Sequence, residues 1–326
     1  MNNFDLIQAD TIHEVVNSSE NERSRLIAGG TNLIDLMKYR VENPTVLIDI
    51  NKLDLSGIKN GQNGQLILGA LSTNAETAYH KEVEQRYPLL SKAILSGAST
   101  QLRNMATNGG NLMQRTRCYY FYDTTTPCNK REPGSGCSAL EGFNRIHAIL
   151  GTSAQCIATH PSDMCVALAA LNAKITVEGK EGKRQISILD FHRLPGDTPE
   201  KDTNLKADEI ITGIELPKKG FSQNFAYLKV RDRPSYAFAL ISVACGIELE
   251  GGSIKELRVA VGGVAHKPWR LPKVEEKFKG KSATKEIFTE MAEGLMEGAQ
   301  GFGHNDFKIE LAKKTIVRAL IEARDR

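Results

Sequence analysis

The run Arg103-Asn104-Met105-Ala106-Thr107-Asn108-Gly109-Gly110-Asn111 contains a paired-glycine turn with hydroxyl and amide side chains on either side. Paired glycines let backbone N–H groups come close to an anion. A second run of this kind, Ala28-Gly29-Gly30-Thr31-Asn32, follows a predicted strand and opens a predicted helix, whose N-terminus favours negative charge. In one loop alone, a purely geometric need for glycine would explain the pattern equally well. Two such loops in one chain indicate a long ligand that carries a diphosphate.

The composition is that of an ordinary globular protein. The chain has 326 residues, 40% of them hydrophobic, and a formal net charge of +3 at pH 7. Lys and Arg are scattered, and no apolar run approaches the roughly 20 residues of a membrane helix. Residues 1–6 lack the basic start and the apolar stretch of a secretory signal. We therefore expect a soluble chain without nucleic-acid or membrane partners, cytoplasmic by default and periplasmic if a signal-bearing partner exports it.

Hydrophobic periodicity divides the chain into strands and helices. Apolar runs bounded by Asn, Gly or Pro predict a hairpin at 173–188 and strands at 24–28, 45–50, 65–69, 210–216, 225–230, 237–249 and 256–262. Helical spacing predicts helices at 11–17, 163–171, 285–300 and 307–323. The strongest helical pattern of the first half, 74–97, opens at Asn74 as its cap, and Pro88 should break it in two. Pro217 ends a strand, and we place a domain boundary after residue 218.

Four segments follow one another in the order seen in the FAD subunits of molybdenum hydroxylases. They are the glycine run at 28–32, the run at 101–111, Pro161-Ser162-Asp163 and the run at 262–268. The chain therefore resembles the medium-subunit family of xanthine dehydrogenase and carbon monoxide dehydrogenase over nearly its whole length. The run at 103–111 is the most specific element of this resemblance.

The resemblance implies an α+β fold with two domains. A two-subdomain FAD-binding domain would span 1–218, with subdomains at about 1–55 and 56–218. A C-terminal α+β domain at 219–326 would carry a three-stranded antiparallel sheet with helices.

The resemblance also implies which residues bind FAD. Residues 25–33 would hold the pyrophosphate, Ile211 would pack against the cofactor, and Lys229 would lie near the flavin ring. The complete implied set is Arg25, Leu26, Ile27, Ala28, Gly29, Gly30, Thr31, Asn32, Leu33, Thr107, Gly110, Asn111, Asp163, Ile211 and Lys229.

Four cysteines lie in a polar insert at about 114–157. Most members of the resembled family lack this insert and run almost directly from the Gly-Gly-Asn turn to the Pro-x-Ser-Asp turn. The four cysteines are Cys118, Cys128, Cys137 and Cys156. Their spacing lacks C-x-x-C pairs, and four thiolates suit either zinc or an iron–sulfur cluster. Basic residues at 115, 117, 130 and 131 would offset a negatively charged cluster, and the aromatic run 119–122 would shield it from water.

The insert resembles that of the FAD subunit of periplasmic-type bacterial aldehyde oxidoreductase, which carries FAD and a [4Fe–4S] cluster. The flavin subunit of 4-hydroxybenzoyl-CoA reductase has a comparable insert with other cysteine spacing. Cys165 and Cys245 sit in apolar contexts, and we expect no chemistry from them. No metal-ligand spacing links the histidines His147, His160, His192 and His266, and we predict no hydrolytic triad and no catalytic residue.

The resulting hypothesis is an electron relay that works only in a complex. Substrate would be oxidised at a molybdenum cofactor in a large partner subunit, and electrons would cross [2Fe–2S] clusters in a small partner. They would reach FAD in this chain and leave to an external acceptor. Three alternatives stay open: a flavin-binding assembly module with a structural four-cysteine zinc site, a 4-hydroxybenzoyl-CoA reductase-type flavin subunit, and a self-sufficient flavin oxidase.

Overall fold

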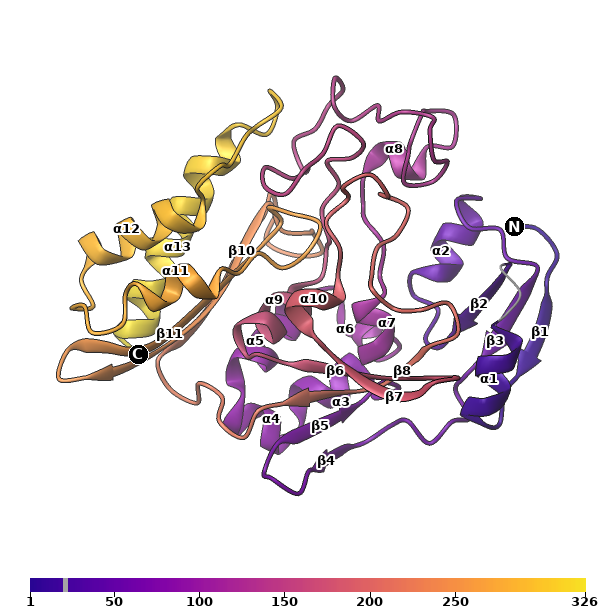
Figure 1. Cartoon of the computed structure of the whole chain (residues 1–326), viewed down its shortest axis with the longest axis horizontal. Coiled ribbons are helices and arrows are strands. Elements are labelled where there is room, and N and C mark those ends of the chain that lie inside the picture. Colours follow the sequence, from indigo (N-terminus) through magenta and orange to yellow (C-terminus); the bar gives the residue numbers. More distant parts are fainter. Residues whose placement is uncertain (20–22) are drawn as a thin grey trace.

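The computed structural model describes residues 1–19 and 23–326, which form three β-sheets and the helices around them. Figure 1 shows the first sheet at one end of the molecule and the C-terminal sheet with its helices at the other. The central, larger sheet lies between them.

The first sheet is parallel. Its strands, in spatial order, are β1 (Asp5–Gln8), β3 (Val46–Asp49) and β2 (Ser24–Ile27), and its helices are α1 (Ile12–Ser18) and α2 (Leu33–Lys38). Parallel strands need crossover connections, and α1 lies in the connection from β1 to β2. The Thr11 hydroxyl begins α1 by accepting the N–H of Glu14 at 3.2 Å. The predicted helix at 11–17 and strands at 24–28 and 45–50 are confirmed. The fully exposed β1 was not predicted.

The central sheet is antiparallel and has five strands. In spatial order they are β4 (Ile58–Asn60), β5 (Leu66–Gly69), β8 (Ile210–Leu216), β6 (Lys174–Gly179) and β7 (Gly182–Ser187). The helices of this part are α3 (Asn74–Tyr79), α4 (Lys81–Arg86), α5 (Pro88–Ser96), α6 (Thr100–Arg103), α7 (Asn108–Leu112), α9 (Asp163–Ala170) and α10 (Ile188–Phe191). Every residue of α9 is buried, because this helix packs between α5 and the C-terminal sheet.

The prediction of a helix at 74–97 broken once at Pro88 is wrong in two respects. The segment forms three helices, since the extended backbone at His80 separates α3 from α4 before Pro88 begins α5. The cap is Thr73, whose hydroxyl accepts the N–H of Glu76 while the Glu76 carboxylate accepts the N–H of Thr73. Asn74 is buried inside the first turn instead.

The C-terminal sheet is the predicted three-stranded antiparallel meander. Its strands are β9 (Phe225–Val230), β10 (Ile241–Glu250) and β11 (Ser253–Gly262), with β10 in the middle, and its helices are α11 (Pro272–Glu276), α12 (Lys285–Leu295) and α13 (Phe307–Arg324). Alternate residues point to opposite faces of a strand. Val243 and Cys245 accordingly belong to the core formed with α12 and α13, whereas Ala244 belongs to the core that contains α9. The division of the chain after residue 218 stays a prediction.

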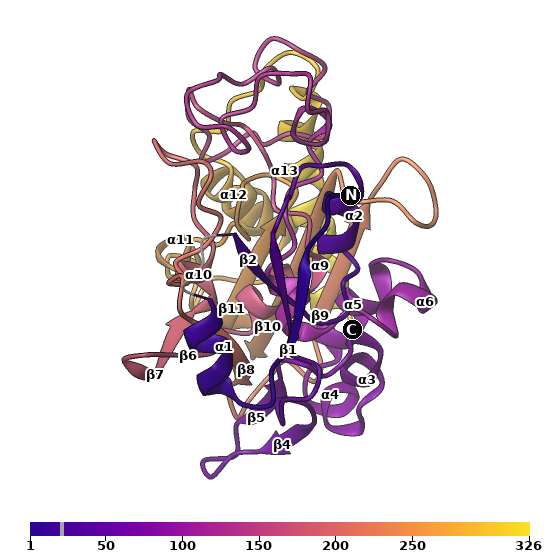
Figure 2. The same ribbon diagram turned by 90° about the vertical axis from the view of Figure 1, so that its right-hand side faces the viewer.

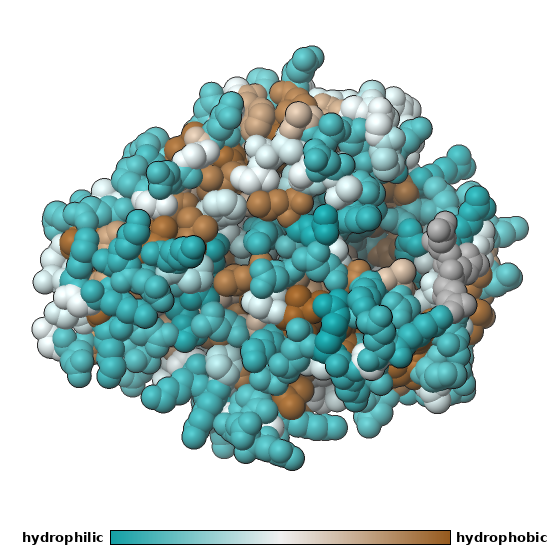
Figure 3. Space-filling model, viewed as in Figure 1, coloured by the Kyte–Doolittle hydropathy of each residue, from teal (hydrophilic) through white to brown (hydrophobic). Residues whose placement is uncertain are grey.

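The cysteine-rich insert has little regular structure apart from α8 (Tyr119–Tyr122) and isolated bridges such as Cys128 to Cys137. Its loops lie beyond the central sheet in both views (Figures 1 and 2). Hydrophilic side chains dominate the face in Figure 3, with smaller apolar patches among them. In the described part of the chain, no helix is long and apolar enough to cross a membrane.

Candidate functional site: a cofactor cavity and a cysteine cage

The two glycine runs meet in space. A side-chain carbon at Gly29 would lie 1.9 Å from the carbonyl oxygen of Met105, so glycine is required where the loop after β2 touches the segment between α6 and α7. Gly30 has a φ of +69°, a conformation that side chains rarely adopt. The two runs, which the sequence indicated as loops for one long ligand, are therefore in direct contact.

The first run presents unused hydrogen-bond donors. Within the described residues, the backbone N–H groups of 29–32 have no acceptor in the protein. The buried side-chain nitrogen of Asn32 also has no partner there, although its oxygen accepts the N–H of Arg115 at 2.8 Å. A group of free amides beside a helix start suits a bound anion such as a diphosphate.

The second run uses its donors within the protein. The N–H of Asn108 donates to the Ser72 carbonyl, and that of Gly110 donates to the Thr107 hydroxyl at 3.1 Å. The fully buried Asn108 side chain donates to the Gly69 carbonyl at 3.1 Å and holds α7 against β5. This run therefore shapes the wall of a site rather than offering free backbone amides.

A cavity of about 510 Å³ opens between these elements. The residues of the predicted FAD set that line it are Arg25, Leu26, Ile27, Ala28, Gly29, Gly30, Thr31, Asn32, Leu33, Thr107, Gly110 and Ile211. The polar lining that sequence reasoning missed includes Glu42, Arg115, Asp202, Lys206 and Glu209. These residues are far apart in the sequence, and no local pattern marks them.

The other three predicted residues, Asn111, Asp163 and Lys229, lie outside the cavity lining and form a neighbouring buried group. Asp163 accepts hydrogen bonds from the Lys229 ammonium at 2.7 Å and from the Tyr227 hydroxyl at 2.5 Å. Asn111 connects this group to the cavity wall, because it lies in α7 and accepts from Ser162, the cap of α9, at 2.6 Å. Burial and the Asp163 charge raise the pKa of Tyr227 well above its ordinary value.

Sequence reasoning missed Tyr227, although a signal for it existed. It lies two residues before Lys229 on β9, so the two side chains share one face of the strand.

The four cysteines of the insert line one small cavity. All six cysteines of the chain are free, with each of these residues among those the structure describes. Backbone N–H groups donate to three of the insert sulfurs, for example Ala158 to Cys156 at 3.4 Å. Burial raises the pKa of Cys118 to about 12 and that of Cys156 to about 11. A metal must therefore displace the protons of these thiols when it binds. We call this group, Cys118, Cys128, Cys137 and Cys156, the cysteine cage.

A chain of ion pairs connects the cavity with the cysteine cage. Arg25 pairs with Glu42 at 3.2 Å, and Glu42 with Arg115 at 2.6 Å. Arg115 pairs with Asp202 at 2.7 Å, and Asp202 with Lys130 at 2.5 Å. The first four residues line the cavity, whereas Lys130 lies in the lining of the cage. We call these five residues the charge chain.

Comparison with known protein families shows that two family models together match nearly the whole chain. The family model of the FAD-binding domain in molybdopterin dehydrogenase matches residues 2–219, and that of the CO dehydrogenase flavoprotein C-terminal domain matches residues 226–323. The chain belongs to the molybdopterin dehydrogenase flavoproteins. It is thus an FAD-binding oxidoreductase subunit of a complex, as the resemblance of its sequence implied.

Individual relatives agree with this placement. The chain is 50% identical to the aldehyde oxidoreductase FAD-binding subunit PaoB of Escherichia coli over 303 residues, 92% of each chain. It is 29% identical to the glyceraldehyde dehydrogenase medium chain of Sulfolobus acidocaldarius over 98% of each. A carbon monoxide dehydrogenase chain from Hydrogenophaga pseudoflava shares its fold, with a TM-score of 0.77 at 24% identity over 99% of this chain and 98% of that one. The predicted medium-subunit fold of this flavoprotein is therefore confirmed.

Proposed function

We propose that this flavoprotein is the FAD- and [4Fe–4S]-carrying electron-transfer subunit of a molybdenum-dependent aldehyde oxidoreductase. A large molybdenum-cofactor subunit and a small [2Fe–2S] subunit would be its partners, and an external acceptor would receive the electrons. The convergence of four cysteines on one cavity carries the cluster part of this proposal. The aldehyde substrate is proposed from the 50% identity to PaoB.

The residues of the cavity fit FAD. The free amides of 29–32 and the cavity-lining Arg25 would hold the diphosphate, and the buried Ile211 would pack against an apolar part of the cofactor. Asn111, Asp163 and Lys229 would bind and orient the remainder from the adjoining group. Bound FAD supplies the conversion between two-electron and one-electron transfer.

The geometry of the cysteine cage favours an iron–sulfur cluster over zinc. Four sulfurs around one Zn²⁺ at about 2.3 Å would lie about 3.8 Å from one another. Among the described residues, no three of the cage sulfurs lie within 4.8 Å of one another. A [4Fe–4S] cluster binds each cysteine through a different iron and so needs a wider cage. The N–H donors to the sulfurs would stabilise its negative charge.

Metal and sulfide analysis of the complex, purified without oxygen, tests this function. Beyond the iron and acid-labile sulfide of the [2Fe–2S] clusters in the small subunit, about four of each should be present per copy of this chain, the [4Fe–4S] stoichiometry. Ser in place of any cage cysteine should lower the iron content. Cys245→Ser is the control, because Cys245 is also a buried free thiol but lies in the C-terminal core, and the iron content of this variant should stay unchanged. One zinc per chain, with iron and sulfide only in the amounts of the [2Fe–2S] clusters, would support the assembly-module alternative and refute the [4Fe–4S] cluster.

A further inference from the structure

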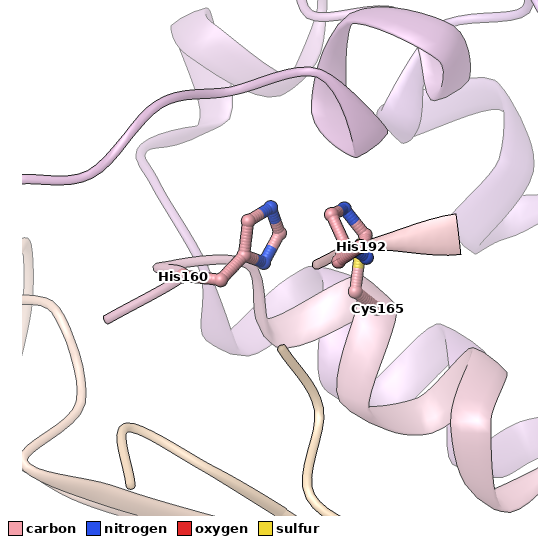
Figure 4. Close-up of side chains that lie close together, drawn as sticks. All are labelled: His160, Cys165 and His192. Atoms are coloured by element: carbon pink, nitrogen blue, oxygen red, sulfur yellow. The ribbon is translucent and has the colours of Figure 1, made fainter. Parts of the chain in front are cut away.

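Three buried side chains from separate segments converge beside α9. They are His160 in the segment before the helix, Cys165 in its first turn and His192 just after α10. One potential ligand atom of each lies within 4.8 Å of those of the other two. The two imidazole rings lie side by side in Figure 4, with centroids 4.0 Å apart, and the Cys165 sulfur approaches the His192 ring. Sequence spacing gave no sign of this group, because its members meet only through the fold.

One backbone carbonyl fixes the orientation of the His192 ring. His192 donates its Nε2–H to the Leu112 carbonyl oxygen at 2.9 Å. The remaining ring nitrogens, Nε2 of His160 and Nδ1 of His192, are buried and have no hydrogen-bond partner in the described part of the chain. Nδ1 of His192 therefore carries an unshared lone pair, because the proton of this neutral ring is on Nε2.

This arrangement is typical of metal-binding histidines. Such residues usually donate their second N–H to a backbone carbonyl or carboxylate, which fixes the tautomer and aims the other nitrogen at the metal. Without a ligand, a buried polar group that lacks a partner destabilises the fold. A metal binds imidazole in its neutral form, so the two rings would add no charge to the site.

The size of the group suits a small ion after slight contraction. Three atoms no more than 4.8 Å apart lie at most about 2.8 Å from a common centre, against metal–ligand distances of about 2.0–2.3 Å. A shift of about half an ångström in each side chain would bring all three into contact with an ion.

The net charge of His160, Cys165 and His192 determines which kind of metal ion the site favours. Cys165 can supply one thiolate, and its proton would leave as the metal–sulfur bond forms. A divalent ion would then leave a net positive charge in a fully buried site, which is costly. The carboxylates that act on the group, Asp202 and Asp163, are already paired with other cations. A monovalent ion with one thiolate and two neutral imidazoles is electrically neutral, and a soft ion with imidazole and thiolate ligands matches Cu⁺. We propose that His160, Cys165 and His192 form a buried three-coordinate Cu⁺ site, separate from the cysteine cage.

Copper retention by the complex tests the proposal. Because the site is buried, Cu⁺ should be supplied during expression, and loosely held metal should be removed with a chelator before analysis. The wild type should retain one more copper per chain than Cys165→Ala. Cys245→Ala should retain as much as the wild type, since it removes an equally buried thiol elsewhere. His192→Gln, which keeps a polar side chain, should also lose the copper and guards against misfolding of one variant.

X-ray absorption at the copper edge separates this site from copper held by the cage. Two nitrogen ligands and one sulfur ligand are expected, and they should vanish in Cys165→Ala. Equal copper contents of the wild type and Cys165→Ala, or ligation by sulfur alone, would overturn the proposal. Zn²⁺ retained on the same three residues would overturn the choice of ion. The comparison does not depend on whether the cage holds iron, since the cage cysteines are the same in every variant.

Discussion

Replacing Asp202 with Asn should destabilise the protein, because Asp202 holds the middle of the charge chain. Its carboxylate accepts from Arg115 at 2.7 Å and from Lys130 at 2.5 Å, and it lies 3.3 Å from Nε2 of His266. The Lys130 side chain is 1% exposed, against 19% for Asp202 and for Arg115. An amide of the same shape would remove the negative charge and turn an NH2 group, which cannot accept, toward either Lys130 or Arg115. Lys130 would keep its hydrogen bond to the Pro199 carbonyl but would lose its anionic partner.

The size of the loss follows from burial. Breaking a buried ion pair by removing one partner typically costs about 3–5 kcal/mol, because the other charge stays buried and uncompensated. Arg115 keeps its second partner, Glu42, at 2.6 Å, so we expect the lower end of this range, about 3 kcal/mol. With an unfolding entropy of about 2.1 cal/mol/K per residue, a chain of 326 residues loses about 1.5 °C per kcal/mol, so the melting temperature should fall by about 4–5 °C.

The measurement is thermal unfolding followed by circular dichroism, on protein saturated with FAD and kept free of oxygen. Asp232→Asn is the control, since Asp232 is 55% exposed and pairs with Arg145 at 2.8 Å on the surface. Such exposed pairs contribute about 0–1 kcal/mol. A melting temperature of Asp202→Asn equal to that of the control would refute the view that Asp202, Arg115 and Lys130 form a largely buried, mutually dependent unit.

The pH dependence gives an independent check. Burial alone would raise the pKa of Asp202, but Arg115, His266 and Lys130 hold it well below its ordinary 3.8. A carboxyl with a lowered pKa in the folded state contributes stability that is present above its unfolded pKa and lost as the pH falls through its folded pKa. The advantage of the wild type over Asp202→Asn should therefore be constant near neutral pH and shrink below about pH 4.

Three further predictions concern other parts of the molecule. Gly30→Val should yield folded protein with little FAD, measured as flavin absorbance per chain, because a branched side chain is strained at φ +69°; full FAD content would contradict the role of residues 25–33. Asp163→Ala should weaken FAD binding, measured by flavin fluorescence on dilution, and leave the iron content unchanged; loss of iron with retained flavin would show that Asp163 is misplaced. Burial lowers the pKa of Lys308 from 10.5 to about 7, so the unfolded chain binds the extra proton between these values and stability should rise with pH across that window. Lys308→Met should flatten this rise in urea titrations, and an unchanged slope would contradict it.

The local features of the fold were predictable from the sequence. The glycine runs, the meander of β9 to β11 and the buried α9 all follow from residue patterns a few positions long. The end of α3 at His80 was not predictable from the sequence, because a histidine between two helical patterns is not a residue that typically ends a helix. Thr73 could have been recognised as the cap, since Glu76 three residues later completes a capping box.

The sites were predictable in part, for a physical reason. The four residues of the cysteine cage all carry thiols, so they can be recognised in the sequence as candidate metal ligands whatever their spacing. Glu42, Arg115 and Asp202 are ordinary charged residues, and their ion pairs join positions 73 and 87 residues apart. One sequence contains no signal for such a pairing. The group of His160, Cys165 and His192 shows the same limit. The apolar sequence around Cys165 predicted an inert side chain, and nothing in it indicated that the two histidines lie beside Cys165 in the fold.

The side chains of the charge chain alternate between positive and negative charge, and this alternation suggests an electrostatic role. They alternate from Arg25 through Glu42, Arg115 and Asp202 to Lys130, so both ends are cationic. Arg25 lines the cavity proposed for the FAD diphosphate, and Lys130 lines the cage proposed for a negatively charged cluster. Without the two carboxylates, three cations would repel one another in a partly buried region. The carboxylates thus let the protein present one positive charge to each anionic group at a net internal charge of +1. A loss of Asp202 should therefore disturb both sites at once, whereas a loss of Asp163 should disturb only the flavin.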